Sequence, residues 1–195
     1  MAAERVRVGV LISGRGTNMI ALSEYKRREE RAYDIAMVAS NVPEARGLVV
    51  ARRLGLPVWA RSHIGMNRAD FDRLIDAELR RHDVELVALA GYMRLLSPEF
   101  IAAWPDRILN IHPSLLPLHK GLDTHRRALI AGDLWAGCSV HLVTDELDDG
   151  PVIAQSKIRI RPRDDADTLA ARVLEEEHKL YPQALDQFAQ SLLPR

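Results

Sequence analysis

The sequence lacks the features that mark secreted, membrane-spanning or nucleic-acid-binding proteins. It contains one cysteine, Cys138, which cannot form an internal disulfide and is typical of a reducing compartment. No run of about 18 apolar residues occurs, and the chain enters its first apolar stretch without a signal sequence. The 27 basic and 27 acidic residues cancel, so no overall field attracts nucleic acid or an anionic membrane. We therefore expect a cytoplasmic protein that acts on small molecules.

Several nucleotide-binding motifs are incomplete or missing. Gly14 and Gly16 follow the first apolar stretch, but Met19 occupies the third glycine position of the dinucleotide-binding motif. The second apolar stretch, residues 34–39, ends without the acidic residue that binds a ribose in such sites, which disfavours NAD. No phosphate loop of the nucleoside triphosphatases is found, so an NTPase is also disfavoured.

A group of possible metal ligands has to be weighed as well. It consists of His112, His119, Asp123, His125 and His141. Imidazoles and carboxylates are zinc ligands, but no H-E-x-x-H motif accompanies them and only one cysteine is present. We expect no metal.

Apolar, strand-like stretches alternate with amphipathic, helix-like stretches along most of the chain. Strands are expected at 6–12, 34–39, 58–59, 86–90, 108–111, 138–143 and 152–157, and helices at 19–31, 45–54, 69–81, from Ser97-Pro98-Glu99 onward, at 124–131 and at 167–180, with Pro182 interrupting or kinking the last. This alternation predicts an α/β, Rossmann-like fold, with an open, mostly parallel sheet and helices on both faces. The last two strands are expected to form a C-terminal antiparallel hairpin, and residues 1–195 a single domain.

Three side chains in the second half of the chain form a candidate catalytic group. Asn110 and His112 are two residues apart at the end of a predicted strand, so they can face one pocket, and Asp148 follows in an acidic loop. An amide donor, an imidazole and a carboxylate can together stabilise an oxyanion and transfer a proton. The alternatives are a hydrogen-bonded histidine in the core and, for Asp148, a residue that only shapes a turn.

The segment Ser13-Gly14-Arg15-Gly16-Thr17-Asn18 joins the first predicted strand to the first predicted helix. Free backbone N–H groups and the helix dipole favour an anion there, so a phosphate could bind. The alternative is an ordinary turn in which Thr17 or Asn18 caps the helix.

Glu177 lies on the apolar stripe of the last predicted helix, in line with Leu169, Val173 and Leu180. A carboxylate that faces inward needs a partner, and ligand hydroxyl groups would supply one. Alternatively, Glu177 reaches solvent at the edge of the stripe.

These segments together resemble the phosphoribosylglycinamide formyltransferases, the folate-dependent family also called glycinamide ribonucleotide transformylases. The matching segments are 8–14, 89–94, Asn110-Ile111-His112-Pro113-Ser114-Leu115-Leu116-Pro117, 121–125, 139–141 and 147–148. The resemblance covers almost the whole chain. It implies a formyltransferase fold, transfer of a formyl group from 10-formyltetrahydrofolate to the amine of phosphoribosylglycinamide in purine synthesis, no metal, and a monomer or homodimer.

The resemblance also implies roles for individual residues. The catalytic residues are Asn110, His112 and Asp148, supported by Ser114 and His141. The substrate's phosphate and ribose are bound by Gly14, Arg15, Gly16, Thr17, Asn18 and Glu177. Folate is bound by Arg68, Leu89, Met93, Arg94, Leu95, Leu96, Ile108, Val143, Asp145, Glu146 and Leu147. Protonated His112 and Asn110 would stabilise the formyl oxygen, and Asp148 would raise the pKa of His112.

The chain departs from this family's pattern at four positions. Arg15 replaces a small or polar residue and is expected to add a phosphate contact. Lys120 and Asp123 stand where many members have proline and histidine, so a histidine there cannot serve the proton network. Asp149 replaces a frequent glycine, and its like charge is expected to raise the pKa of Asp148.

Three other functions compete with this interpretation. Methionyl-tRNA formyltransferases normally carry a C-terminal tRNA-binding domain, and formyltetrahydrofolate deformylases an N-terminal regulatory domain. Neither is expected, since the chain ends at Arg195 and its first strand begins by Val6. A non-catalytic sensor of phosphate ligands would explain the glycine loop but does not need Asn110, His112 and Asp148 together.

Overall fold

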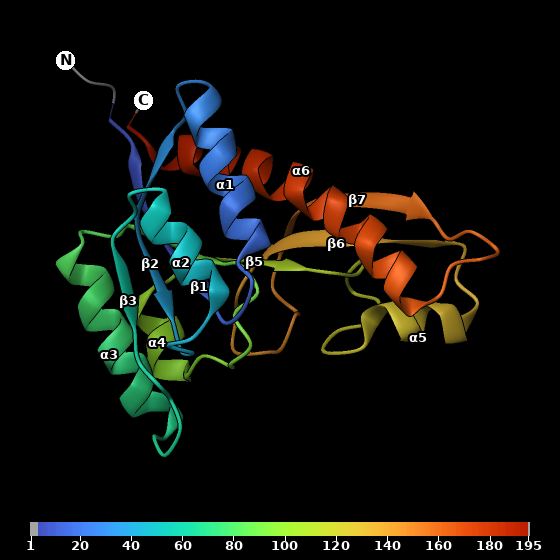
Figure 1. Cartoon of the computed structure of the whole chain (residues 1–195), viewed down its shortest axis with the longest axis horizontal. Helices are drawn as coiled ribbons and strands as arrows, with labels where there is room; N and C mark the ends of the chain where they lie inside the picture. The colour runs from blue at the N-terminus through green and yellow to red at the C-terminus, as the bar shows by residue number, and fades with distance from the viewer. Residues whose placement is uncertain (1–3, 195) are drawn as a thin grey trace.

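The computed structural model describes residues 4–194, and these form a seven-stranded sheet with the order β3-β2-β1-β4-β5-β6-β7 (Figure 1). The strands are β1 (Val6–Ile12), β2 (Tyr33–Ser40), β3 (Val58–Ala60), β4 (Leu86–Leu89), β5 (Ile108–His112), β6 (Trp135–Leu142) and β7 (Val152–Arg159). Neighbouring strands from β3 to β5 are parallel, whereas β6 runs antiparallel to β5 and β7 antiparallel to β6. The predicted parallel sheet with a C-terminal antiparallel pair is confirmed.

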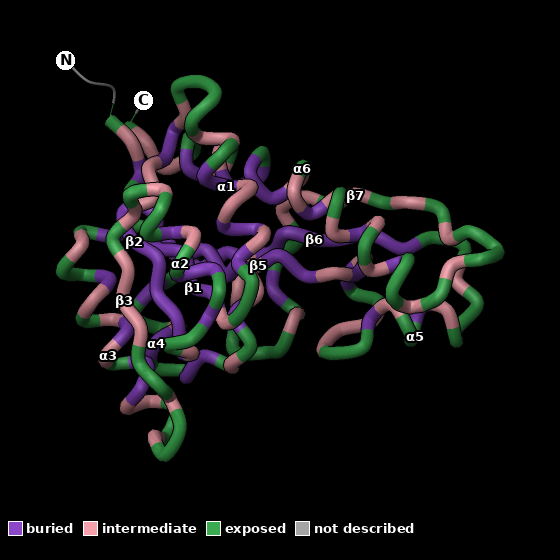
Figure 2. Tube along the Cα trace, in the orientation of Figure 1, coloured by how far each residue is buried: buried purple, intermediate pink, exposed green. Residues whose placement is uncertain are grey.

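Helices cover both faces of the sheet, because successive residues of its buried strands point to opposite sides. One apolar cluster joins Val8, Val10 and Ile12 to α1 (Thr17–Arg28), α2 (Arg46–Arg53) and α6 (Ala166–Leu192). A second cluster joins Leu11 to α3 (Arg68–Arg81) and α4 (Pro98–Ala103). The remaining helix is α5 (Thr124–Ala131), near the end of the sheet that β6 and β7 form. Figure 2 shows that buried residues follow the central strands, while β7 and α5 are more exposed.

Two helices begin where their sequences predict. Ser97 precedes α4, its hydroxyl oxygen accepts a hydrogen bond from the backbone N–H of Phe100 at 3.3 Å, and Pro98 takes the first helical position, which needs no donor. The long α6 begins with a reciprocal capping box between Asp165 and Thr168.

The expected interruption at Pro182 is wrong. Helix α6 continues through this proline to Leu192, although the ring removes one hydrogen bond of the helix. Pro182 is itself buried, and Tyr181, Leu185 and Ala189 are fully buried beside it in the main core. Apolar burial on both sides of the proline offsets the lost hydrogen bond.

The topology brings the candidate residues to one edge of the sheet. Strands β1 and β4 are neighbours, but the chain proceeds from β1 toward β3 in one direction and from β4 toward β7 in the other. Ligands of open α/β sheets bind beyond the carboxyl ends of strands at such a switch point. The backbone N–H of Ser13, just after β1, donates to the carbonyl of Gly91, just after β4, and so joins these two strand ends. Within residues 4–194, no helix is long and apolar enough to cross a membrane.

Candidate active site

Asn110 and His112 lie at the carboxyl end of β5, where the strand leaves the core. Asn110 is opposite His141 in the antiparallel pairing of β5 with β6, and its Nδ2 lies 3.1 Å from Nε2 of that histidine. Ser114 holds the turn that follows β5, because its hydroxyl donates to the carbonyl of Leu118 at 2.6 Å. An amide and two imidazoles thereby gather at one strand end.

Asp148 reaches these groups from the loop between β6 and β7. Its Oδ2 lies 3.3 Å from Nδ1 of His112, and its Oδ1 lies 3.5 Å from Nε2 of His141. The backbone N–H of Gly121 also donates to Oδ2, at 2.9 Å. The structure therefore brings together Asn110, His112 and Asp148, which the sequence separates by up to 38 positions (148 minus 110).

The backbone of the acidic loop is held in an uncommon conformation. Asp148 has a φ of 50°, in the left-handed region that non-glycine residues rarely enter and that is often found at functional sites. Gly150 lies two residues further along the chain. Its position has no room for a side chain, because a Cβ there would lie 1.9 Å from the carbonyl oxygen of Leu142. Asp148 therefore both shapes the turn and places its carboxylate beside His112, so the turn and the catalytic interpretations of this residue are compatible.

Burial, not the neighbouring carboxylate, decides the charge of His112. Its side chain is 7% exposed, and burial lowers its pKa below the ordinary value, although the backbone bond to His119 and the charge of Asp148 both raise it. Asp148 does raise this pKa, as expected, but burial outweighs its charge, so the expected protonated His112 is wrong for the free protein. His112 is therefore mainly neutral at pH 7.

Asp148 is ionised. Burial raises its pKa, but the nearby side chain of His141, the hydrogen bond from the N–H of Gly121 and the nearby imidazole of His112 together hold the pKa below its usual range. The expected rise caused by Asp149 is wrong, because that side chain is more than half exposed and forms an ion pair with Lys120. Lys120 and Asp149, both departures from the family pattern, thus neutralise each other's charge.

His141 orients the amide of Asn110. Nδ1 of His141 lies 2.8 Å from the carbonyl oxygen of Leu142, which can only accept, so Nδ1 carries a hydrogen. Nε2 then accepts one N–H of Asn110, and the second N–H of that amide is left for another acceptor. His141 is nearly fully buried, so this arrangement is fixed by packing.

The glycine loop between β1 and α1 has the form of an anion site. Gly16 is the residue before α1, with φ of 70°, and no side chain caps the helix, so the expected alternative of a Thr17 or Asn18 cap is wrong. Gly14 and Arg15 are exposed. The first backbone N–H groups of α1 are therefore available to a ligand.

Gly47, which belongs to no recognised sequence motif, supports this loop. Its backbone N–H donates to the carbonyl of Gly14 at 2.9 Å. A Cβ at Gly47 would lie 2.6 Å from the side chain of Ile12 and 3.1 Å from the Cα of Gly16. The only signal in the sequence was a glycine shortly after the loop that follows β2. This glycine indicates the contact with Gly14 only when the folded structure shows that the two loops touch.

Glu177 faces inward, as the apolar stripe of α6 predicts, and the solvent-edge alternative is wrong. It is 7% exposed, and Nδ2 of Asn18 donates to its Oε2 at 2.7 Å. Burial raises its pKa, and the bond from Asn18 offsets this in part. Among the described residues, Oδ1 of Asn18 is buried without a hydrogen-bond partner, so the pair retains capacity for a ligand donor.

The residues expected to bind folate divide into a buried and an exposed group. Leu89, Leu96 and Ile108 are at most 8% exposed and belong to the core under α3 and α4, with Val143 packed against them. The exposed members are Met93, Leu95, Asp145, Glu146 and Leu147. Large apolar side chains that face solvent beside a polar site are typical of a surface that a ligand covers.

The two arginines expected near the folate's tail differ in their surroundings. Arg68 is exposed at the start of α3. The Arg94 guanidinium lies over the Phe71 ring, 5.3 Å from its centre, and donates to the carbonyl of Met66 at 3.4 Å. Both act on the charge of Asp72, so they lie in one region.

A polar relay between the ends of β1, β2 and β4 was also not foreseen. The Ser13 hydroxyl donates to Oδ1 of Asn41 at 2.6 Å and accepts from the backbone N–H of Met93 at 2.7 Å. Asn41 in turn contacts His63 at 3.2 Å. No sequence spacing links these residues, because each follows a different strand.

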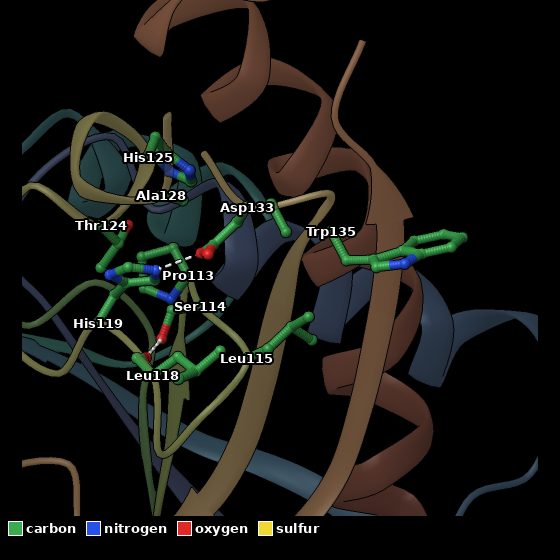
Figure 3. Close-up of a pocket in the computed structure, with 11 residues that line it drawn as sticks. Pro113, Ser114, Leu115, Leu118, His119, Thr124, His125, Ala128, Asp133 and Trp135 are labelled. Atoms are coloured by element: carbon green, nitrogen blue, oxygen red, sulfur yellow. Dashed lines mark hydrogen bonds and ion pairs between the residues drawn. The ribbon is translucent and has the colours of Figure 1, made fainter. Parts of the chain in front are cut away.

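Two cavities lie beside this site. One is lined by Ser114, His119, Thr124, His125 and Asp133, behind the turn that follows β5 (Figure 3). The other is a groove between α1 and α6 that Thr17, Glu24 and His178 help to line. Within residues 4–194, no group of three or more histidine, cysteine, aspartate or glutamate side chains could hold a metal ion.

Comparison with known proteins shows which family this chain belongs to. Residues 6–185 match the model of the formyl transferase family. The phosphoribosylglycinamide formyltransferase of Escherichia coli (strain K12) is 41% identical over 189 residues, covering 96% of this chain and 89% of that protein. The crystal structure of phosphoribosylglycinamide formyltransferase from Brucella melitensis is 46% identical, with a TM-score of 0.91, over 95% of this chain and 96% of that one.

A larger animal protein shares the same region. The trifunctional purine biosynthetic protein adenosine-3 of Gallus gallus is 42% identical over 182 residues, or 93% of this chain. The chain spans only 18% of the length of that relative. The similarity therefore concerns one part of a multifunctional protein.

Proposed function

Because the chain belongs to the formyl transferase family, we propose that it transfers the formyl group of 10-formyltetrahydrofolate to the amine of phosphoribosylglycinamide, a step of purine synthesis. The observation that carries this proposal is the convergence of Asn110, His112 and Asp148 beyond the carboxyl end of β5. The acceptor is inferred from the two phosphoribosylglycinamide formyltransferases described above, which this chain resembles along nearly its whole length.

The site's surfaces fit both substrates. The uncapped start of α1, with Arg15 beside it, suits the phosphate of the acceptor. Asn18 and the buried carboxylate of Glu177 suit ribose hydroxyl groups, since a free acceptor atom remains there among the described residues. The exposed apolar side chains of Met93 and Leu147 suit the flat ring of a folate.

Each catalytic group then has a defined task. The folate supplies a formyl carbon that an amine can attack. Asn110 donates its unused N–H to the formyl oxygen as negative charge develops there. His112 takes the proton that the attacking amine loses, at Nδ1, and ionised Asp148 stabilises the resulting imidazolium. The same proton is then returned to the departing folate nitrogen.

An assay of the purified protein tests this function. The folate product is followed by absorbance with phosphoribosylglycinamide present, with it absent, and with glycine amide as a truncated acceptor. We expect rapid product formation only with the complete acceptor. Equal rates without any amine would identify a deformylase, and no product under any condition would support a binding protein.

A further inference from the structure

The segment 119–121 touches both members of the His112–Asp148 pair through its backbone. Nε2 of His112 lies 3.1 Å from the carbonyl oxygen of His119. The N–H of Gly121 donates to Oδ2 of Asp148 at 2.9 Å. A single short segment thereby fixes the imidazole and the carboxylate relative to one another.

The contact with His119 also determines where His112 exchanges its proton. A carbonyl oxygen can only accept, so Nε2 of His112 must carry a hydrogen. In the neutral ring, Nδ1 is then the unprotonated nitrogen, and it is the one that faces Asp148 at 3.3 Å. If the carbonyl moved away, either ring nitrogen could carry the hydrogen and the ring would lose its fixed orientation.

The backbone of His119 does not hold this position without help. Its φ is 54°, a left-handed conformation that persists only where the surrounding structure enforces it. The imidazole of His119 supplies such a restraint, because its Nε2 lies 2.6 Å from Oδ2 of Asp133. Figure 3 shows these two side chains pointing toward one another, with a dashed line between them.

Asp133 is in turn a rigid anchor. It follows Gly132, which ends α5 in a left-handed conformation, and its own N–H donates to the carbonyl of Ala128 at 3.1 Å. The side chains of His119 and Asp133 are only 16% and 27% exposed. A half-buried pair of this kind is screened less by water than a surface ion pair.

We propose that the His119–Asp133 pair is a positioning device for catalysis: it holds the carbonyl of His119 against Nε2 of His112 and so keeps Nδ1 of His112 as the proton-exchanging nitrogen. Neither His119 nor Asp133 contacts the reacting atoms, and both act through His112. The kinetic test of this inference rests on the proposed formyl transfer, whereas its spectroscopic test needs only the free protein.

The test compares Asp133→Ala and Asp133→Asn with Arg81→Ala as a control. Asp133→Ala removes the partner of His119, whereas Asp133→Asn keeps an oxygen that can accept from it. Arg81→Ala breaks a surface ion pair with Glu78 on α3, far from the site in sequence. We expect kcat to fall about 10- to 100-fold in Asp133→Ala, to recover largely in Asp133→Asn and to stay unchanged in the control, with KM for both substrates constant.

Nitrogen NMR of histidine-labelled protein gives the second readout. In the wild type we expect His112 to be a single tautomer with the hydrogen on Nε2, and in Asp133→Ala a mixture of tautomers. An unchanged His112 spectrum and unchanged kcat in a folded Asp133→Ala protein would overturn the proposal. If instead the wild type transfers no formyl group, the proposed function fails while the NMR result still decides the role of the pair.

Discussion

Nδ1 of His112 lies 3.3 Å from Oδ2 of Asp148, and both side chains are less than a tenth exposed. Burial keeps the histidine neutral, and hydrogen bonds keep the aspartate ionised. The pair therefore has room for one additional proton, held between two groups of defined orientation. Such a pair is suited to carry a proton from an attacking amine to a leaving group.

Substitution of either proposed catalytic group should remove most of the activity. Asn110→Ala deletes the N–H donor to the formyl oxygen, and Asp148→Asn deletes the charge that stabilises protonated His112. We expect kcat to fall about 100- to 1,000-fold in each variant, the usual effect of losing an oxyanion donor for Asn110→Ala and of impaired proton transfer for Asp148→Asn. Steady-state kinetics measure this, with thermal unfolding as the control for folding. Near-normal turnover in either variant would refute the assignment.

The pH dependence of the rate should reflect the lowered pKa of His112. The proposed mechanism needs this ring neutral, so kcat/KM falls only when pH drops through the pKa of His112 in the free enzyme. Because burial lowers that pKa, we expect the acid limb below the ordinary histidine value of about 6.5. In Asp148→Asn the limb should move to still lower pH, since the charge that raises the pKa is gone. An upward shift in this variant contradicts the pairing.

Glu177→Gln should weaken binding of phosphoribosylglycinamide without weakening the fold. The amide keeps the size of the side chain and still accepts from Asn18, but it loses the charge that ribose hydroxyls would contact. We expect KM for phosphoribosylglycinamide to rise about 10-fold or more, as for the loss of a charged hydrogen bond, with KM for folate unchanged. Equal rises in both KM values would argue against a ribose contact.

The same variant should be more stable than the wild type at neutral pH. The pKa of Glu177 is raised in the folded protein, so its contribution to stability is complete below the ordinary value and is lost as pH rises through the folded-state pKa. Glutamine does not titrate. The free energy of unfolding of Glu177→Gln should therefore exceed that of the wild type by more at pH 8 than at pH 5, as measured with urea.

Gly47→Ala should weaken phosphate binding from a distance. Its Cβ would lie 2.6 Å from the side chain of Ile12 and 3.1 Å from the carbonyl of Gly14, so the glycine loop must shift. We expect a loss of about 1–3 kcal/mol in stability and a higher KM for the phosphorylated acceptor.

Gly55→Ala is the matched control, just beyond the other end of α2. It has a φ of 76° and no atom within 4 Å of its Cβ position, so it should lose about 1–2 kcal/mol through backbone strain alone. Its KM should not change. If Gly47→Ala also leaves KM unchanged, the loop does not bind the phosphate.

Local pattern was sufficient to predict most of the fold. The alternation of apolar and amphipathic stretches gave the strands of the sheet within a few residues, and Ser97-Pro98-Glu99 gave the start of α4. The interruption at Pro182 was wrongly expected because the local rule counts a lost hydrogen bond. The burial of Tyr181 and Leu185 beside the proline, which only the folded chain reveals, offsets that loss.

The members of the candidate site were predictable from the sequence, but their charges were not. Asn110 and His112 share a strand face, Asp148 stands in an acidic loop, and the resemblance to a family assigned all three a catalytic role. The sign of the pKa shift of His112 depends on the competition between burial and the charge of Asp148, and the sequence does not report the depth of burial. The contacts of Gly47 and of Asp133 were equally hidden, because they join loops that are remote in sequence.

Helix α6 joins the start of α1 to the centre of the sheet. It is the last element of the sheet-covering layer, it carries Glu177 to the start of α1, and the hydroxyl of its Tyr181 lies 3.1 Å from the carbonyls of Leu89 and Leu109 in β4 and β5. Without α6 the chain would lose both Glu177 beside Asn18 and the Tyr181 hydroxyl between β4 and β5. The proposed ribose contact therefore forms only when this last helix has packed onto the sheet.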